Sequence, residues 1–352
     1  MIPTFRPRPL RPLAARLRTA VRAGARASRP PRRRALALAL GLLAGLAGAP
    51  SVAADAAWPT RPIRIVVPLP PGGPSDIVLR PMAAAMQAAL GQPVVVDNKP
   101  GANGNLGAAE VARAAPDGHT WLWTTDTSLT INPHIYRSTG FAPGALVPLD
   151  YAARFSQTLV CNPATGLRSV ADLVAAARSR RLTYASGGAG APGHMVMEML
   201  LATAGVPMTH VPYRGPAAAT QDLIGGQVDC GFLAGPTVLP FVQSGRLVAL
   251  ASSGAVRDRL LPQVPTVAES GYPGFDGTFW LVLAAPRGLP PDIQRRFLAA
   301  LSDAARAPGQ RERAADAGIE MAGSTPAEAQ ARTAALSAQW GAVAKRIGLQ
   351  VD

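Results

Sequence analysis

Short apolar runs alternate with longer amphipathic stretches along most of the chain. The short runs are rich in β-branched residues, which is typical of strands, and the alanine-rich stretches between them carry apolar residues at helical spacing. The expected strands and helices follow one another over residues 63–69, 76–90, 93–98, 104–115, 119–125, 169–180, 182–186, 194–205, 208–213, 217–226, 228–233 and 238–245.

This alternation predicts an α/β fold whose mostly parallel sheets are covered by helices on both faces. Because the plan occurs twice, we expect two lobes, with crossings near "ARFSQTLVCNP" and near "GTFWLVLAAPRGLP". Lobe I would comprise residues 55–156 with 277–352, and lobe II residues 157–276. The two crossings would form a hinge beside a central ligand cleft, into which the carboxyl ends of the strands point.

The first part of the chain is typical of an export signal. Residues 1–54 contain eleven arginines and no acidic residue, so they carry +11 of the net charge of +14. An apolar run over 35–46 precedes small residues at 51–54, the pattern of a cleaved signal peptide. A transmembrane anchor is the alternative, although the run is short. We expect Sec export to the periplasm, and the arginines at 32–34 also permit a twin-arginine signal.

The mature chain offers little for nucleic acid or metal. Its remaining charge of +3 forms no basic stripe, and aromatic residues are few, so we expect no nucleic-acid partner. The four histidines lie far apart, and we expect no metal and no cofactor. Cys161 and Cys230 each lie in an apolar, strand-like run. We interpret them as unpaired buried residues, and a disulfide is the alternative that export leaves open.

A proline- and glycine-rich turn, "VVPLPPGGPSD", joins the first expected strand to the first expected helix. The start of a helix exposes unpaired amides and a partial positive charge, which suit a carboxylate. The alternative is that Ser75 or Asp76 only caps its own helix. Asp76 is expected to order the turn, since a carboxylate repels an anion. The candidates here are Pro70, Gly72, Gly73, Ser75 and Asp76.

Two further polar turns follow expected strands. "TTDTS" offers hydroxyl groups, and "SGGAGAPGH" opens a helix in the second lobe. An ordinary polar turn is the alternative for each. A turn of this kind in each lobe favours a ligand with separated anionic groups. The candidates are Thr125, Asp126 and Thr127 in the first lobe, and Ser186, Gly187, Gly190, Ala191 and His194 in the second.

Nucleotide and hydrolase motifs are weak. No Gly-Lys-Ser/Thr follows the first glycines, and the GxGxxG match at Gly188, Gly190 and Gly193 lacks the acidic residue that a dinucleotide site needs. No GxSxG elbow is present. A catalytic triad whose residues are distant in the sequence would show no local motif, so a secreted hydrolase remains an alternative.

Several motifs closely resemble the Bug (TctC-like) proteins, the periplasmic solute receptors of the tripartite tricarboxylate transporter group. They are "WPTRPIRIVVPLPPGGPSDIVLRPMA", "LGQPVVVDNKPGANGNLGAAEVARAAPDGHT", "INPHIY", "HVPYRGPAAATQDLIGGQVD" and "LPQVPTVAESGYPGF", in order over nearly all of residues 58–350. The resemblance implies a two-lobed type II periplasmic binding-protein fold that closes on a small organic carboxylate without catalysis. It also implies delivery to separate membrane transporter subunits. We expect a monomer. A ligand-sensing receptor for a signalling system is the alternative.

The chain departs from the family pattern at positions that bear on the ligand. Pro71 and Pro74 stand where the family commonly has alanine and glycine, and a proline supplies no amide. Ala191 replaces a frequent hydroxyl residue, and Leu233 replaces an aspartate. An amino-acid ligand would need an acidic partner for its ammonium group. Leu233 therefore favours an apolar or aromatic carboxylate, and it joins the candidate site residues.

Overall fold

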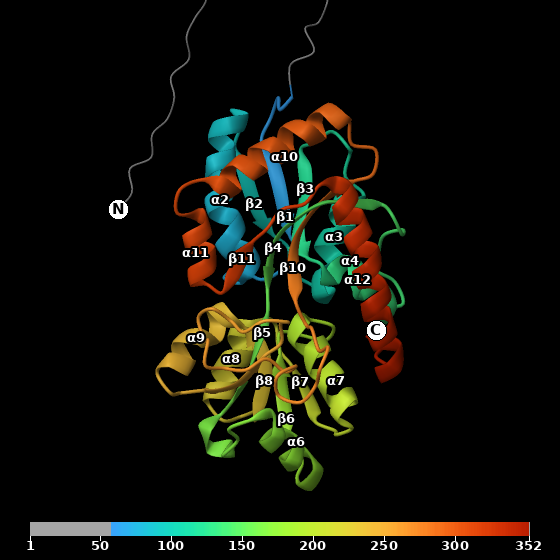
Figure 1. The fold of residues 1–352 in the computed structure, drawn as a ribbon. Helices are drawn as coiled ribbons and strands as arrows, with labels where there is room; N and C mark the ends of the chain where they lie inside the picture. Colours follow the sequence, from blue (N-terminus) through green and yellow to red (C-terminus); the bar gives the residue numbers. More distant parts are fainter. Residues whose placement is uncertain (1–57, 352) are drawn as a thin grey trace, which may run out of the picture. The chain divides into compact units, whose positions relative to one another are not determined.

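Two β-sheets carry the fold of residues 58–351, which are the residues that the computed structural model describes (Figure 1). All the described residues belong to one compact unit. The expected signal peptide, with its alternative anchor and its twin-arginine motif, lies outside the described residues. Among the described residues, none of the helices combines the length and apolar character needed to cross a membrane.

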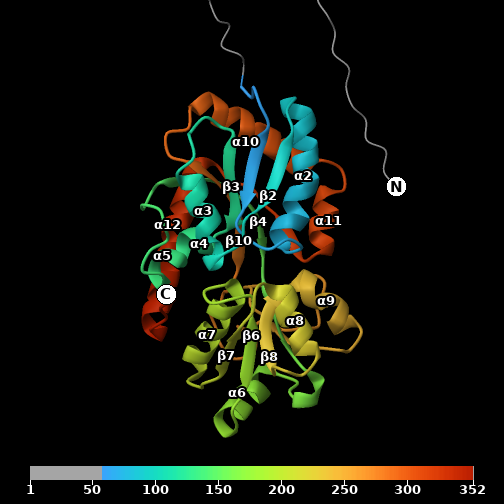
Figure 2. The same cartoon turned by 180° about the vertical axis from the view of Figure 1, so that it is seen from behind.

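The larger sheet has six strands in the order β11-β4-β10-β3-β1-β2. Its strands are β1 (Ile63–Val67), β2 (Val94–Asn98), β3 (Thr120–Thr125), β4 (Leu146–Phe155), β10 (Phe279–Pro286) and β11 (Ile319–Met321). Its helical segments are α2 (Pro74–Leu90), η1 (Ala102–Gly104), α3 (Asn105–Ala112), α4 (Thr127–Thr130), α5 (Asn132–Ile135), α10 (Pro291–Arg306), α11 (Gln310–Asp316) and α12 (Pro326–Ile347). Helices α2, α10 and α11 pack together on one face, and α3, α4 and α12 cover the other (Figure 2).

The smaller sheet has five strands in the order β7-β6-β8-β5-β9. Its strands are β5 (Gln157–Cys161), β6 (Thr183–Ser186), β7 (Thr209–Pro212), β8 (Cys230–Ala234) and β9 (Val248–Ser252). Its helical segments are η2 (Pro163–Thr165), α6 (Val170–Ser179), α7 (Pro192–Ala204), α8 (Pro216–Ile224) and α9 (Gly235–Gln243).

Helix α2 illustrates why the predicted elements form. Its buried residues include Val78, Met82 and Met86, which recur at helical spacing and pack against Ile63 and Ile65 of β1. The helix ends at Gly91, which adopts the left-handed conformation that glycine tolerates best. The α/β fold in two sheets is confirmed.

The sheets are mixed, whereas the sequence predicted mostly parallel ones. Strand β4 leaves the larger sheet and continues, after Ser156, as β5 of the smaller sheet (Figure 1). Strand β10 returns to the larger sheet after β9. Strand β10 pairs antiparallel with both β3 and β4, and β5 pairs antiparallel with both β8 and β9. Strands β4 and β5 thus run from the larger sheet into the smaller one and β10 runs back, so these crossing strands are antiparallel to their neighbours. Strands β1, β2 and β3 keep the parallel pairing that a strand–helix–strand alternation gives.

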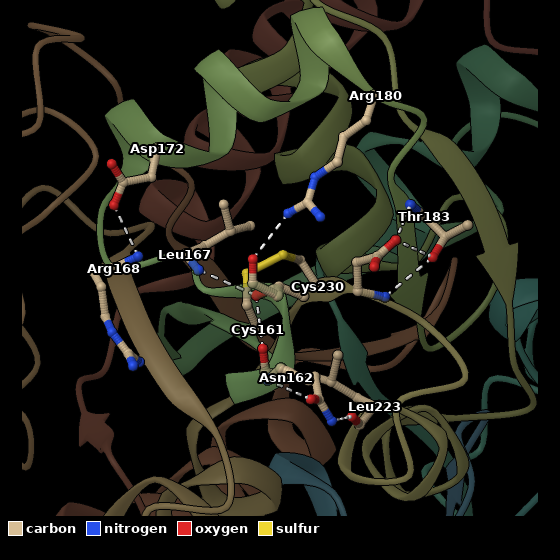
Figure 3. The surroundings of a disulfide bond; sticks show 12 residues. Cys161, Asn162, Leu167, Arg168, Asp172, Arg180, Thr183, Leu223 and Cys230 are labelled. Carbon is tan, nitrogen blue, oxygen red and sulfur yellow. Dashed lines mark hydrogen bonds between the residues drawn. A yellow bond between two sulfur atoms is a disulfide. The ribbon is translucent and has the colours of Figure 1, made fainter.

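Cys161 and Cys230 form a disulfide bond, so the interpretation of two unpaired cysteines is wrong (Figure 3). Each does lie in a fully buried strand, as predicted. However, β5 and β8 are neighbours, and the two cysteines stand directly opposite each other in their antiparallel register. Sequence spacing did not show this pairing because the cysteines are 69 residues apart. Beside them, Asn162 donates to the carbonyl oxygen of Leu223 at 2.9 Å and joins β5 to the end of α8.

Candidate functional site

A cavity of about 100 Å³ lies where the two sheets meet. The carboxyl ends of β3, β6 and β8 face it, together with the β4–β5 crossing. It is lined by Leu69, Pro70, Gly73, Pro74, Ser75, Asn103, Thr125, Phe155, Gln157, Gly187, Ala191, Pro192, Gly193, Gly215, Pro216, Phe232, Leu233 and Ala234.

Four helices begin at the cavity wall. The residues that precede α2, α7, α8 and α9 are Gly73, Ala191, Gly215 and Ala234, and all four line the cavity. None of these four residues accepts a capping hydrogen bond through its side chain, and each helix has a proline in its first two positions. The start of a helix carries a partial charge of about +0.5. The four starts together therefore place about two positive charges beside the cavity.

Two of the helices that begin away from the cavity, α6 and α12, have capped starts, whereas α10 and α11, which also begin away from it, do not. Ser169 accepts a hydrogen bond from the amide of Asp172 at the start of α6, and Thr325 forms a capping box with Glu328 at the start of α12. These side chains satisfy amides that the helix leaves unpaired. At the cavity, the amides of Ser75 and Gly193 have no partner among the described residues. They remain available to a ligand.

The side chains around the cavity are apolar or neutral. Phe155, Phe232 and Leu233 supply apolar surface, and none of the described residues that line the cavity is charged. Ser75 is 3% exposed, and its Oγ has no hydrogen-bond partner among the described residues. Gln157 is 4% exposed and adds an amide group. An anion bound here would meet hydrogen-bond donors and no competing carboxylate.

Asp76 orders the first turn, as expected. Its Oδ2 accepts a hydrogen bond from the amide of Gly72 at 2.8 Å, and its Oδ1 accepts from Asn98 at 3.2 Å. Arg80 also approaches Oδ2, at 3.4 Å. Gly72 has a φ of +87°, which glycine adopts without strain. Neither Gly72 nor Asp76 lines the cavity. The hydrogen bonds of Asp76 instead fix the turn that places Gly73 and Ser75 at the cavity.

A buried histidine pair supports the turn of the second lobe. Nδ1 of His194 accepts a hydrogen bond from the amide of Gly190 at 2.9 Å. The rings of His194 and His210 stack with centroids 3.9 Å apart, and Nε2 of His210 lies 2.7 Å from Oγ of Ser186. Burial lowers the pKa of His194 to about 3 and that of His210 to about 4. Both rings are therefore neutral at physiological pH.

Asp126 and Thr127 belong to the turn "TTDTS", but neither of them lines the cavity. Thr125 lines the cavity, and its Oγ1 lies 2.7 Å from Oγ1 of Thr127. Asp126 is fully buried, and its Oδ1 accepts a hydrogen bond from the amide of Trp280 at 3.2 Å. Burial raises the pKa of Asp126 to about 7.

The structure thus divides the sequence candidates into two groups. Those that line the cavity are Pro70, Gly73, Ser75, Thr125, Gly187, Ala191 and Leu233. Those that lie behind it are Gly72, Asp76, Asp126, Thr127, Ser186, Gly190 and His194.

The sequence missed the residues that the crossing strands bring to the cavity. Phe155 and Gln157 flank the β4–β5 crossing, and Phe232 precedes Leu233 on β8. Asn103 and Gly215 also line the cavity. One signal for Gln157 was present, because it is a polar residue between apolar runs at the predicted crossing. No pattern distinguished Phe232 from an ordinary core residue.

Two departures from the family pattern fall on helix starts. Pro74 is the first residue of α2, a position whose amide has no partner within the helix. Ala191 precedes α7 and has no oxygen with which to cap it. A hydroxyl group at this position would compete for the first amides of α7. With alanine, those amides stay open.

The chain matches the family described as "Tripartite tricarboxylate transporter family receptor" over residues 78–349. Three of the solved structures that are similar to it bear on the site. The periplasmic binding protein BugD is 31% identical, with a TM-score of 0.77, and the match covers 83% of this chain and 99% of BugD.

The other two structures contain ligands. A Rhodopseudomonas palustris protein solved with adipate is 33% identical, with a TM-score of 0.78 over 83% of this chain and 99% of that one. MatC from the same species, solved with bound malate, is 29% identical, with a TM-score of 0.75 over 81% and 99% of the two chains.

Proposed function

Because the chain belongs to the tripartite tricarboxylate transporter receptor family, as its motifs predicted, we propose that it captures a small organic carboxylate in the cavity between its two sheets. The observation that carries this proposal is the set of four uncapped helix starts around a cavity without charged side chains. A buried carboxylate must be hydrogen-bonded, and backbone amides at helix starts provide those bonds without side-chain reorganisation. The two ligand-bound relatives hold dicarboxylates.

The proposed site residues form two groups, one that contacts the ligand and one that keeps those contacts in position. Gly73, Ser75, Thr125, Gly187 and Ala191 would contact the ligand, with Pro70 and Leu233 shaping the apolar wall. The candidates behind the cavity would keep these contacts in position: Gly72, Asp76, Asp126, Thr127, Ser186, Gly190 and His194.

The ligand we expect is a carboxylate with an apolar body. Leu233 is 1% exposed and lines the cavity with Phe155 and Phe232. No described carboxylate lines the cavity to pair with an ammonium group. Amino acids would leave that group buried and unpaired, at a cost of several kcal/mol.

Lobe I would comprise residues 55–156 with 277–352, and lobe II residues 157–276, with the β4–β5 and β9–β10 crossings as the hinge. Closure of these lobes would bury the ligand, and a monomer would deliver it to separate membrane subunits. Family membership implies the periplasm. The buried disulfide supports an oxidising compartment, and Sec export would deliver the chain unfolded to that compartment.

A hydrolase is less well supported. Ser186 and His210 form a hydrogen-bonded serine–histidine pair, but Ser186 is fully buried and does not line the cavity. A nucleophile must reach its substrate. We therefore propose binding without catalysis.

A thermal-shift screen with mature protein tests the proposal. The panel contains adipate, malate, benzoate, aspartate and glutamate. A ligand at a hundred times its Kd adds about 2.7 kcal/mol to the free energy of unfolding. We expect the unfolding temperature to rise with carboxylates that have an apolar body, such as adipate and benzoate, and to stay unchanged with aspartate and glutamate. The Leu233→Asp variant should lose at least tenfold in affinity for adipate, because it adds a buried negative charge beside those of the ligand. Tight binding of aspartate alone would overturn the ligand assignment, and no binding by any carboxylate would overturn the function.

A further inference from the structure

Asp126 is a buried acid whose ability to gain or lose a proton plays no part in the binding site proposed above. Its side chain is 0% exposed, and its Oδ2 has no hydrogen-bond partner among the described residues. It directly follows Thr125, which lines the cavity, so its α-carbon lies about 3.8 Å from that of a cavity residue.

The carboxyl group also connects the cavity to the returning strand of the hinge. The amide of Asp126 donates to the carbonyl oxygen of Trp280 at 2.9 Å, and Oδ1 accepts from the Trp280 amide at 3.2 Å. Trp280 is the second residue of β10, the strand that re-enters the larger sheet from the second crossing. Strands β3 and β10 are paired antiparallel, and the acidic side chain of Asp126 adds one more hydrogen bond between the end of β3 at the cavity and the start of β10.

The elements around Asp126 give its charge no basic partner. From β4, Tyr151 is near and directs its hydroxyl to Thr333 at 2.8 Å. From α12, the guanidinium carbon of Arg332 lies 4.1 Å from the ring centroid of Trp280. Within residues 58–351, no ion pair involving Asp126 is present. Strands β3 and β10 and helix α4 contribute backbone amides and hydroxyl groups, as at Thr130.

We propose that Asp126 is a positioning residue whose carboxyl group takes up a proton when the cavity binds an anion, so that carboxylate and proton bind together. The inference rests on the proposed function. An ionised Asp126 would repel a bound carboxylate through low-dielectric protein, whereas the protonated form would not and would keep its bond to Trp280.

The direction and size of the effect follow from this repulsion. Burial already raises the pKa of Asp126 to about 7. At an effective dielectric constant of about 20, a ligand carboxylate that comes within about 10 Å of Asp126 would raise that pKa by about one further unit. Affinity should therefore be highest near pH 6, fall as pH rises through 7, and level off about tenfold weaker near pH 8.5.

Calorimetric titration of mature protein with adipate, between pH 6 and pH 8.5, tests the proposal. His194 and His210 stay neutral in this range because burial lowers their pKa values to about 3 and 4. Repeating each titration in phosphate and in Tris, whose ionisation enthalpies differ, counts the protons taken up. We expect uptake of a substantial fraction of one proton between pH 7 and 8. Adipate binding with equal affinity and no proton uptake at every pH would overturn this proposal alone. No binding of adipate or any other carboxylate of the panel would overturn the proposed function, and this proposal with it.

Two variants locate the proton. Asp126→Asn keeps the acceptor for the Trp280 amide and cannot ionise, so its affinity should be independent of pH and its proton uptake zero. Asp150→Asn is the matched control, because Asp150 is a carboxylate of the same lobe whose pKa burial also raises, but it accepts a hydrogen bond from the Ser324 amide and neither of its neighbours in the chain lines the cavity. It should keep the wild-type pH profile. A pH profile unchanged in Asp126→Asn would assign the proton elsewhere. If that variant does not fold, the proton count of the wild type decides.

Discussion

His194 shows how a residue can matter to the cavity without lining it. Its Nδ1 accepts the amide proton of Gly190, so the neutral ring must carry its own proton on Nε2. Gly190 has a φ of +75°, and a Cβ at this position would lie 2.4 Å from Cδ1 of Ile135. The turn therefore depends on glycine for its path and on His194 for its fixed position.

A pair of substitutions at His194 separates the hydrogen bond from the packing. Asn offers an oxygen near the position of Nδ1, so His194→Asn should retain adipate affinity within about threefold. His194→Leu leaves the amide of Gly190 buried without an acceptor, which costs about 1–3 kcal/mol. Its affinity for adipate, measured by calorimetry, should fall by about tenfold or more. Equal affinities in the two variants would contradict a positioning role for the ring nitrogen.

At the residue scale, the sequence predicted where polar turns occur but not which of their residues reach the cavity. Ser186 and His194 belong to a predicted turn, yet both point their polar atoms into a buried network. That network needs His210, which comes from a different strand, β7. A pairing of this kind depends on strand order, which local patterns do not encode.

Among the elements, the four helices around the cavity begin without a side-chain cap, as α10 and α11 also do. Relative to Ser or Asp at the cap, alanine forgoes about 1 kcal/mol of stability and glycine a few tenths of a kcal/mol. Proline in the first turn offsets part of this loss, since its fixed φ suits a helix and its missing amide is not needed there. Open helix starts are thus compatible with a stable fold and leave amides for a ligand.

Gly73 allows a direct test of the helix start of α2. A Cβ at Gly73 would have nothing within 4 Å, and its φ of −90° suits any residue. Gly73→Ser adds an oxygen that can cap α2, and Gly73→Ala is the matched control without that oxygen. We expect the serine variant to change the free energy of unfolding by a few tenths of a kcal/mol. Its adipate affinity should fall about tenfold, since the hydroxyl group competes for a charge-assisted hydrogen bond worth about 1.5–3 kcal/mol.

The alanine control should bind adipate within about threefold of the wild type. Calorimetry of the two variants side by side measures the difference. A serine variant that binds as well as the alanine variant would show that the amides of α2 do not contact the ligand.

Strongly periodic elements were predicted well. Helix α2 was expected over 76–90 and spans Pro74–Leu90, and α7 was expected over 194–205 and spans Pro192–Ala204. Strands β4 and β11 were not predicted. Residues of β4 such as Pro148 and Asp150 interrupt its apolar pattern, and three-residue β11 is too short to show one. These strands form through pairing in the sheet, which is a property of the whole lobe.

For the whole molecule, the disulfide contributes to stability at a distance from the cavity. Cys161 ends β5 and Cys230 begins β8, whereas Gln157 and Ala234, at the opposite ends of the same two strands, line the cavity. A bond that closes a loop of 69 residues stabilises the folded chain by about 4 kcal/mol in the chain-entropy model.

Replacing both cysteines tests whether the disulfide stabilises the fold without affecting the cavity. The double variant Cys161→Ala with Cys230→Ala should unfold in denaturant with a free energy lower by about 2–4 kcal/mol. Its adipate affinity at 25 °C should stay within about threefold of the wild type, because the cavity ends of β5 and β8 remain paired. The wild type treated with reductant in denaturant should match the variant. A loss of adipate affinity with an unchanged free energy of unfolding would contradict the proposal that the disulfide acts on stability and not on the cavity.

The backbone origin of the proposed contacts has a consequence for how such a receptor would change over time. Every residue except proline supplies the same amide, so most substitutions at a helix start cannot delete a donor. Side chains on the wall, such as Leu233 and Phe232, carry no such constraint. Mutation would then exchange one organic acid for another readily, while the preference for acids as a class would persist. Conventional alanine scanning would find few determinants of that preference.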